Sequence, residues 1–287
     1  MTNLRLKIAQ IKKEIISFLE KITFSRKKTI SIFYDSEAVD INSAYIKSKR
    51  MLSENYQIPI EILDLRSRNI EEWEKYIGQI ASSHFLFFEL PIPNIYLPLL
   101  NFLSSENDID GLRSKLLNHI DYQSFKYYPA TVATIYFLIE YLDLVKKDKS
   151  ILFIGRSKHL GGFIYHLIEK QNGFQETMLM HTKTTDKKTL FNKADVVVSC
   201  INQANAYHTN QLKDNAVLID GTFEILNGKV KGSFLIDHED CVKRHIKYTP
   251  VPYGVGQLTT FFLLLNYISP KYGINFAKCL KRFLNTK

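Results

Sequence analysis

The sequence predicts an α/β protein in which parallel sheets are wrapped by helices, with two domains in the chain. Short runs of β-branched and aromatic residues alternate with helical segments through both halves of the 287 residues. One such run ends on a turn that contains glycine and serine, at residues 155–162, and leads into a helical pattern. With 45% hydrophobic residues, the chain can bury one large or two modest cores, and two domains is the expected division.

The first half begins with an amphipathic helix, which is not the pattern of a signal peptide. Its apolar face is formed by Leu4, Ile8, Ile11, Ile15 and Leu19. Strands are expected at residues 29–34, 59–65 and 85–90, and helices at 41–56, 70–81, 112–118 and 131–145. This order of strand and helix is typical of a parallel sheet.

The second half repeats the alternation. Strands are expected at residues 151–154, 177–181, 195–200 and 216–220, and helices at 162–170 and 187–193. The pattern is typical of a dinucleotide-binding domain. A last helix is expected from about Gln257 to Leu284, carrying the chain back toward the first domain.

Composition narrows the class of protein. The 38 basic and 29 acidic residues give a net charge of +9, but the lysines are spread in pairs without an arginine-rich arm. Solvated lysine faces or anionic small ligands explain this better than nucleic acid. Three widely spaced cysteines predict neither disulfides nor a zinc site and fit the cytoplasm. The longest apolar run, 261–265, is too short to span a membrane, so we expect a soluble protein.

The turn after residues 151–154 carries chemistry in one interpretation. Gly155, Ser157 and Gly161 allow a tight turn and a close backbone approach, and the following helix would aim free N–H groups at a phosphate. The spacing G-x-S-x-x-x-G differs from the dinucleotide fingerprint, so an ordinary strand-turn-helix stays open. Arg156 and the His181–Thr184 segment suit a 2′-phosphate, while exposed loop polarity is the alternative.

Other candidates lie in the first half. Tyr45 and Lys49 share one helix face, where an aromatic plane and an ammonium could hold and protonate a flat substrate; a surface lysine over a packed tyrosine is the alternative. Glu89 interrupts an apolar strand, which indicates a partner or a function. Asp108 and Asp110 form an acidic turn, which helix capping also explains.

Two further segments complete the candidates. Thr249–Gly256 is a proline- and glycine-rich loop that forms either a shaped wall or a simple connection. His238, followed by two acidic residues, is expected in a surface turn, and no histidine pair has metal spacing.

In their order and spacing, these segments resemble the bifunctional methylenetetrahydrofolate dehydrogenase/cyclohydrolase family over nearly the whole chain. The family motifs correspond to Tyr45–Lys49 (YIKSK), Phe88–Pro93 (FELPIP), Asp108–Gly111 (DIDG), Pro129–Val132 (PATV), Ile154–Gly161 (IGRSKHLG), His181–Thr184 (HTKT) and Thr249–Thr259 (TPVPYGVGQLT).

The resemblance implies two domains with a cleft between them, a folate derivative in the cleft and NADP on the second domain. The first would be an N-terminal folate-binding catalytic domain, residues 1–127 completed by 262–287, and the second an NADP-binding Rossmann-like domain, residues 128–261. In the family, a hydride passes from 5,10-methylenetetrahydrofolate to the nicotinamide, and water opens the methenyl product to 10-formyltetrahydrofolate. A homodimer is also implied.

The resemblance also assigns residues. Tyr45 would stack on the folate, Lys49 would be the acid/base, with Glu89 beside it, and Asp110 would hold the pterin. The other substrate contacts would be Leu90, Pro91, Pro252, Tyr253 and Gly254. The cofactor contacts would be Thr131, Gly155, Arg156, Ser157, Gly161, His181, Thr182, Cys200 and Ile201.

Two departures from the family pattern shape the functional hypotheses. Glu89 replaces a glutamine and should raise the pKa of Lys49, which weakens the lysine as a base and endangers the cyclohydrolase step. Tyr253 replaces a glycine in the loop bordering the folate. The leading hypothesis is an NADP-dependent methylenetetrahydrofolate dehydrogenase with cyclohydrolase activity weakened or lost. The alternatives are an ordinary bifunctional enzyme, a non-catalytic paralogue that binds a nucleotide or a partner protein, and a dehydrogenase acting on another small substrate.

Overall fold

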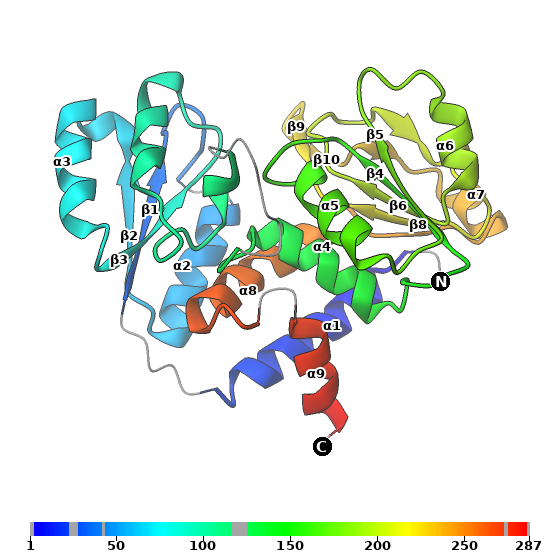
Figure 1. Cartoon of the computed structure of the whole chain (residues 1–287), viewed down its shortest axis with the longest axis horizontal. Coiled ribbons are helices and arrows are strands. Elements are labelled where there is room, and N and C mark those ends of the chain that lie inside the picture. Colours follow the sequence, from blue (N-terminus) through cyan, green and yellow to red (C-terminus); the bar gives the residue numbers. More distant parts are fainter. Residues whose placement is uncertain (1–2, 23–27, 42–43, 116–124, 273–274, 286–287) are drawn as a thin grey trace. The chain divides into compact units, whose positions relative to one another are not determined.

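The computed structural model describes residues 3–22, 28–41, 44–115, 125–272 and 275–285. The chain divides into two compact units, each with its own parallel sheet (Figure 1). The three-stranded unit consists of Thr23–Ala130 and Phe262–Gly273. The five-stranded unit consists of Met1–Ile22, Thr131–Phe261 and Ile274–Lys287. The predicted α/β class with parallel sheets is confirmed.

The three-stranded unit has the predicted alternation of strand and helix. Its strands are β1 (Thr29–Tyr34), β2 (Ile60–Asp64) and β3 (His84–Phe88), in the parallel order β2-β1-β3. Its helices are α2 (Ala44–Tyr56), α3 (Ile70–Ile80) and the short η1 (Leu65–Ser67), η2 (Asn94–Phe102) and η3 (Leu112–Lys115). Of the helix expected at 112–118, the last three residues lie outside the described part of the chain.

Alternation along these strands gives the sheet two different faces. Phe33 faces α3, where its ring stacks on Phe88 at 4.8 Å and meets Trp73 edge-on at 5.5 Å. Ile30 and Ile32 face the opposite way. Both faces of the sheet are therefore covered, as the near-continuous apolar runs of the strands require. Helix α3, on one of these faces, begins with a capping box formed by Asn69 and Glu72.

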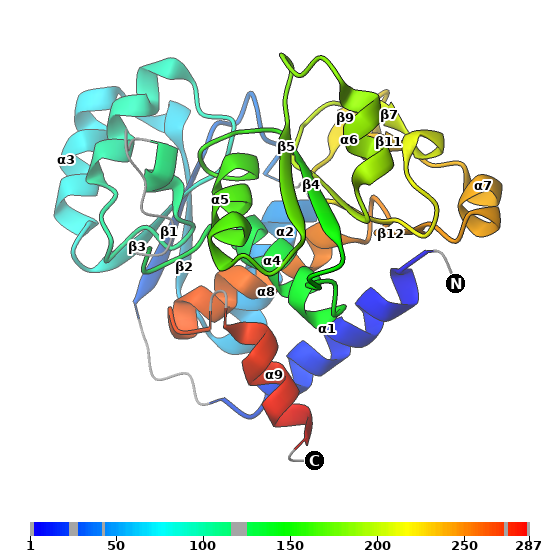
Figure 2. The same ribbon diagram turned by 45° about the vertical axis from the view of Figure 1, so that its right-hand side comes forward.

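The five-stranded unit has a sheet of the order β12-β8-β6-β4-β5, with every neighbouring pair parallel. Its strands are β4 (Ser150–Ile154), β5 (Glu176–Met180), β6 (Val196–Ser199), β8 (Val217–Asp220) and β12 (Lys247–Tyr248). Its longer helices are α1 (Arg5–Leu19), α4 (Ala130–Tyr141), α5 (Gly161–Gln171), α6 (Lys187–Lys193) and α9 (Phe276–Asn285). Figure 2 shows α5 and α6 on opposite faces of this sheet.

Strand β4 has β5 on one side and β6 on the other, so the chain changes direction across the sheet at this strand. In open parallel sheets, such a switch leaves a crevice at the carboxyl ends of the two strands between which the direction reverses. The candidate residues 155–161 and 200–201 lie at these ends.

Short elements that the sequence did not predict complete this unit. They are β7 (Tyr207–His208) paired with β11 (Phe234–Leu235), the hairpin β9 (Glu224–Leu226) and β10 (Lys229–Lys231), η4 (Thr209–Gln211) and α7 (His238–Lys243). The turn expected at His238 is therefore the first turn of a short helix, because Asp237 caps it by accepting a hydrogen bond from the amide of Asp240.

The division into units differs from the expected domain bounds at both ends of the chain. Helices α1 and α9 belong with the five-stranded sheet instead of the first domain. Phe18 of α1 packs against Phe276 and Phe283 of α9, with ring centroids 5.2 and 5.4 Å apart. The amide of Leu4 donates to the carbonyl of Tyr248 at 2.9 Å, which ties α1 to strand β12.

The last expected helix is in fact two, α8 (Val255–Ile268) and α9. Pro270 explains the break, because it has no N–H for a helical hydrogen bond and restricts the residue before it. Within the described parts of the chain, no helix is long and apolar enough to cross a membrane.

Candidate functional site

Lys49 and Glu89 form a buried ion pair in the three-stranded unit. The Nζ of Lys49 lies 2.8 Å from Oε2 of Glu89, and the two side chains are 2% and 11% exposed. Lys49 projects from α2, and Glu89 follows β3, where its amide donates to the carbonyl of Phe33. The same ammonium lies 4.5 Å from the centroid of the Phe87 ring. This aromatic contact could not be predicted, because Phe87 lies in a continuous apolar run with nothing to distinguish it.

The expected rise of the Lys49 pKa is wrong in direction. Burial lowers the pKa of Lys49 below its usual value, and Glu89 and Asp110 only partly offset this. The sequence argument considered the neighbouring carboxylate but not the desolvation of the ammonium. Glu89 therefore stabilises the charged form of Lys49, while the buried surroundings of the ammonium destabilise that form.

Asp110 is a buried carboxyl group that interacts electrostatically with Lys49 and Glu89. Burial raises the pKa of Asp110 to about 7, and the amide of Ala130, which donates to its Oδ1 at 2.8 Å, opposes the rise. The negative charges of Asp108 and Glu89 raise the pKa of Asp110, and the positive charge of Lys49 lowers it. Asp108 has the capping role considered from the sequence, because it accepts hydrogen bonds from the amides of Leu112 and Arg113. Burial raises the pKa of Asp108 to about 6.

The turn that carries Asp110 is held by a close approach at Gly111 and by Asn266, which the sequence analysis did not single out. Gly111 has φ +63°, and a Cβ there would lie 2.7 Å from Cδ of Pro129. The side-chain amide of Asn266 donates to the carbonyls of Ile109 and Tyr128, each at 2.9 Å. A single asparagine within the apolar stretch FFLLLN was the available signal.

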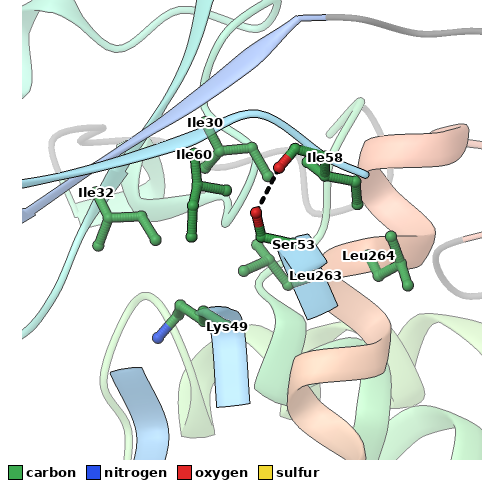
Figure 3. Close-up of a pocket in the computed structure, with 8 residues that line it drawn as sticks. All are labelled: Ile30, Ile32, Lys49, Ser53, Ile58, Ile60, Leu263 and Leu264. Atoms are coloured by element: carbon green, nitrogen blue, oxygen red, sulfur yellow. Dashed lines mark hydrogen bonds between the residues drawn. The ribbon is translucent and has the colours of Figure 1, made fainter. Parts of the chain in front are cut away.

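A small apolar pocket lies beside Lys49. Figure 3 shows Ile30, Ile32 and Ile60 from the sheet near Leu263 and Leu264 of α8, with the ammonium of Lys49 directed away from the leucines. The hydroxyl of Ser53 donates to the carbonyl of Ile58 at 2.5 Å. The lining is almost entirely apolar, so this pocket offers no polar group to orient a substrate apart from Lys49 and Ser53.

The remaining substrate candidates are distributed over the two compact units. Tyr45 lies in α2, one turn before Lys49, and its side chain lies outside the described part of the structure. Leu90 and Pro91 follow Glu89, and Pro91 is exposed. Pro252, Tyr253 and Gly254 belong to the five-stranded unit.

The loop 249–254 holds Tyr253 in a backbone conformation that favours glycine. Tyr253 has φ +80° and is half exposed. Its ring centroid lies 4.9 Å from the guanidinium carbon of Arg5 on α1. Gly254 packs backbone to backbone, since a Cβ there would lie 2.3 Å from the carbonyl oxygen of Pro250. The loop is thus a shaped segment with an aromatic and cationic surface.

The turn after β4 is a cradle that a Cβ would fill. Gly155 has φ +102°, and a Cβ there would lie 2.9 Å from the carbonyl oxygen of Cys200. A Cβ on Gly161 would lie 2.3 Å from the carbonyl oxygen of Gly155. The ends of β4 and β6 and the start of α5 therefore meet backbone to backbone, which brings 155–161 together with Cys200 and Ile201.

The first amides of α5 differ from the expectation of free donors. Ser157 accepts hydrogen bonds from them, through its hydroxyl from Gly161 at 3.3 Å and through its carbonyl from Gly162 at 2.9 Å. Arg156 is exposed beside this turn, so its guanidinium is accessible to an anion.

The other cofactor candidates lie at neighbouring strand ends. His181 and Thr182 follow β5, and the amide of His181 donates to the hydroxyl of Thr184 at 3.0 Å. Cys200 is buried, and burial raises the pKa of its thiol well above the usual value, so the thiol stays protonated. Thr131 lies in the first turn of α4, in the same unit. These positions fit a dinucleotide at the switch between β4 and β6.

The family model of the tetrahydrofolate dehydrogenase/cyclohydrolase NAD(P)-binding domain matches residues 129–272, half of the chain. The chain belongs to this family. The family match begins one residue from the expected start of the second domain and includes the turn after β4, the strand ends and the 249–254 loop.

Two relatives, both called bifunctional protein FolD, are similar to this chain over more than the half that the family model matches. The bifunctional protein FolD of Petrotoga mobilis is 25% identical over 261 residues, which cover 90% of this chain and 92% of that protein. The bifunctional protein FolD of Lactobacillus acidophilus is 28% identical over 229 residues, covering 77% and 78%.

Solved structures of the family share the fold. The Trypanosoma brucei methylenetetrahydrofolate dehydrogenase-cyclohydrolase, complexed with NADP cofactor and inhibitor, aligns with a TM-score of 0.75 at 21% identity and covers 98% of this chain and 96% of its own. The Campylobacter jejuni FolD enzyme aligns with a TM-score of 0.71 at 23% identity and covers 96% of both chains. At these identities, the likeness supports the family fold, and the roles of single residues rest on the geometry described above.

Proposed function

We propose that this protein oxidises 5,10-methylenetetrahydrofolate to 5,10-methenyltetrahydrofolate with NADP. The observation that carries the proposal is the buried cluster of Lys49, Glu89 and Asp110, within a chain whose other half matches the family's NAD(P)-binding domain. A cationic acid/base next to hydrogen-bonding carboxyl groups can hold and protonate a pterin-type heterocycle. Bound NADP supplies a hydride acceptor.

The residues have separable roles in this proposal. Asp110, with a pKa raised to about 7 by burial, can hold the pterin either as an acceptor or, when protonated, as a donor. Lys49 moves a proton at the reacting centre, and Tyr45 stacks on the substrate. Leu90 and Pro91 would form part of the apolar wall beside this cluster. Pro252, Tyr253 and Gly254 are proposed as substrate contacts from the family resemblance. The glycine cradle, together with Thr131, His181, Thr182, Cys200 and Ile201, would surround the cofactor.

The second part of the proposal is that cyclohydrolase activity is weakened relative to the dehydrogenase activity. Glu89 accepts a hydrogen bond from the ammonium of Lys49 at 2.8 Å and favours its charged form. Hydrolysis needs a lysine that gives up and regains a proton, whereas hydride transfer depends mainly on how the substrate is positioned. An ordinary bifunctional enzyme, in which burial lowers the Lys49 pKa enough for both steps, is the alternative.

Two assays test both parts. The rate of NADP reduction with 5,10-methylenetetrahydrofolate measures the dehydrogenase, and the loss of methenyltetrahydrofolate measures hydrolysis. NADP reduction with slow hydrolysis is the expected result, while equal rates support the ordinary bifunctional enzyme. Calorimetric titration with NADP and a folate analogue, combined with these rates, distinguishes the two enzymes from a non-catalytic paralogue. A paralogue of that kind would bind the ligands without turnover, or would bind neither ligand. Reduction of NADP only with other small substrates would support a changed specificity.

The choice of NADP over NAD rests on Arg156. Its exposed guanidinium lies beside the turn at the end of β4, and Thr182 offers a hydroxyl at the end of β5. A fork of N–H donors suits a 2′-phosphate. Replacing Arg156 by Gln should raise the KM for NADP about tenfold and leave the KM for NAD nearly unchanged. Equal changes for both cofactors would assign the 2′-phosphate to other residues.

A homodimer is also proposed, through the hairpin β9-β10. Phe223, Ile225 and Leu226 are 48%, 66% and 43% exposed, which is unusual for large apolar side chains on neighbouring residues. Among the described residues, β9 and β10 pair only with each other, so a second copy can extend either edge of the hairpin. Light scattering after size-exclusion chromatography should give twice the monomer mass, and Ile225→Lys should give the monomer. The three free cysteines support a reducing compartment such as the cytoplasm.

A further inference from the structure

The side chain of Asn266 lies at an unexpected place for a polar group. It is on α8 among apolar residues, and it is completely buried. Both hydrogens of its amide nitrogen have an acceptor, the carbonyls of Ile109 and Tyr128, each at 2.9 Å. The amide oxygen has no hydrogen-bond partner within the described residues. A buried amide that leaves its own oxygen unsatisfied is retained at some cost to stability, so its two donated bonds need an explanation.

The two carbonyls belong to the two segments that hold the Asp110 carboxyl group. Ile109 directly precedes Asp110 in the chain. Tyr128 lies two residues before Ala130, whose amide donates to Oδ1 of Asp110 at 2.8 Å. The side chain of Asn266 therefore bridges the turn that carries the carboxyl group and the segment that supplies its hydrogen-bond donor.

The two segments also pack closely at this point. A Cβ on Gly111 would lie 2.7 Å from Cδ of Pro129 and 2.9 Å from the carbonyl oxygen of Tyr127. On its other side, the turn joins the sheet, because the amide of Leu86 donates to the carbonyl of Asn107 at 2.8 Å. The position of Asp110 relative to β3 and Glu89 thus depends on a small number of backbone contacts, and the Asn266 bridge is one of them.

We propose that Asn266 is a positioning residue for Asp110, which sets where this carboxyl group meets the folate ring. The inference rests on the proposed function for the identity of the ligand, but not for the link between Asn266 and Asp110. Without the bridge, the turn at 108–111 can move away from Ala130, and the hydrogen bond to Oδ1 lengthens. Asp110 then faces Asp108, Lys49 and Glu89, the charged groups around it, in a different geometry.

The test compares Asn266→Leu, which removes the donors at similar volume, with Trp73→Phe. Trp73 is the control in the same unit, because it is fully buried and its indole N–H donates to the carbonyl of Leu65 at 2.8 Å, which belongs to neither segment of the Asn266 bridge. Steady-state kinetics give KM and kcat for methylenetetrahydrofolate. A titration of carboxyl-labelled Asp110 by carbon NMR gives its pKa without any substrate.

Asn266→Leu should raise the KM about tenfold while kcat changes less than about threefold, because binding geometry is lost. The Asp110 titration, expected near pH 7 in the unchanged protein, should move to higher pH because the Ala130 hydrogen bond opposes the rise. Trp73→Phe should also lower the melting temperature, because it removes a buried hydrogen bond, and should move neither quantity.

An unchanged Asp110 titration in Asn266→Leu, or an equal shift in Trp73→Phe, would overturn the inference. If Asn266→Leu does not fold, Asn266→Ser retains one donor and should give a smaller shift in the same direction; no shift would equally overturn it. If the unchanged protein does not turn over folate, the proposed function fails, and the titration still decides whether Asn266 positions Asp110.

Discussion

The ammonium nitrogen of Lys49 lies 2.8 Å from a carboxylate oxygen of Glu89, and both side chains are shielded from solvent. Burial lowers the pKa of Lys49, while the carboxylate raises it. The protonation of this lysine is therefore a balance between two opposing effects, and a change at Glu89 should shift the balance without moving Lys49 from α2.

Replacing Glu89 by Gln should lower the pKa of Lys49 further and increase methenyltetrahydrofolate hydrolysis. A decrease of one pKa unit raises the fraction of neutral lysine about tenfold as long as most of the lysine is charged. The rise of the hydrolysis rate with pH should move to lower pH, and NADP reduction should change less.

Glu61→Gln is the control for this substitution. Glu61 is a carboxylate on strand β2 of the same sheet, where it accepts hydrogen bonds from Ser31 and Tyr76. It should leave the pH profile of hydrolysis unchanged. The same profile in Glu89→Gln and the unchanged protein would contradict the role given to Glu89.

The stability of the protein should fall as the pH rises from about 4 to about 7, in part because of Asp110. Its folded pKa is raised to about 7, above the usual unfolded value, so the folded state binds the proton more tightly. The stabilising contribution is full below about pH 4 and is lost as the pH passes through the folded pKa.

Urea unfolding between pH 5 and 8 measures this dependence. Asp110→Asn should reduce the slope of unfolding free energy against pH by the contribution of one proton. Asp108 and Asp220, with pKa values raised to about 6, should keep part of the slope. An identical slope in Asp110→Asn would mean that this carboxyl group titrates normally.

Gly155→Ala should disrupt the turn after β4. A Cβ at φ +102° and 2.9 Å from the carbonyl oxygen of Cys200 requires the backbone to move. We expect a loss of about 2–4 kcal/mol in unfolding free energy, from strain and steric overlap. Binding of NADP, measured by calorimetry, should be lost. Gly256→Ala is the control, because no described atom outside its own helical turn lies within 4 Å of the added Cβ, and it should retain both stability and binding.

Tyr253 and Arg5 should be energetically coupled. Their contact, at 4.9 Å from ring centroid to guanidinium carbon, is worth about 0.5–1 kcal/mol at an exposed site. Tyr253→Gly relieves the strain of φ +80° but loses this contact, so its net effect on unfolding free energy should be below about 1 kcal/mol. Urea unfolding of both single variants and the double variant measures the coupling. Strict additivity would show that the contact contributes nothing.

Local sequence patterns predicted the strands well, because β-branched and aromatic runs such as 29–34 and 151–154 are buried on both faces and have few other stable structures. Helical spacing made Lys49 a candidate, and a charge within an apolar run made Glu89 one; the structure brings the two side chains into contact. The two-residue strands β7, β11 and β12 were not predicted, because they depend on pairing partners far along the chain. The hairpin β9-β10 is local, and its Asn227-Gly228 turn was an available signal that was missed.

Properties that depend on the surroundings of a residue could not be predicted. The sequence shows that Glu89 is charged but not that Lys49 is desolvated, and desolvation decides the direction of its pKa shift. The apolar faces of α1 and α9 show that these helices are covered, but not by which unit. No local sequence pattern indicates the role of Asn266, because the carbonyls that accept its hydrogen bonds lie 157 and 138 residues earlier in the chain.

The grouping of α1 and α9 with the five-stranded sheet has a consequence for biosynthesis. Each unit is assembled from chain segments that a ribosome delivers at very different times: one needs Phe262–Gly273 and the other needs Ile274–Lys287. Neither unit can complete its core until the last tenth of the chain has emerged. Folding of both units should therefore finish late and nearly together, and closing such long loops slows the search for native contacts. Nascent chains that stop before residue 262 should expose apolar faces and depend on chaperones.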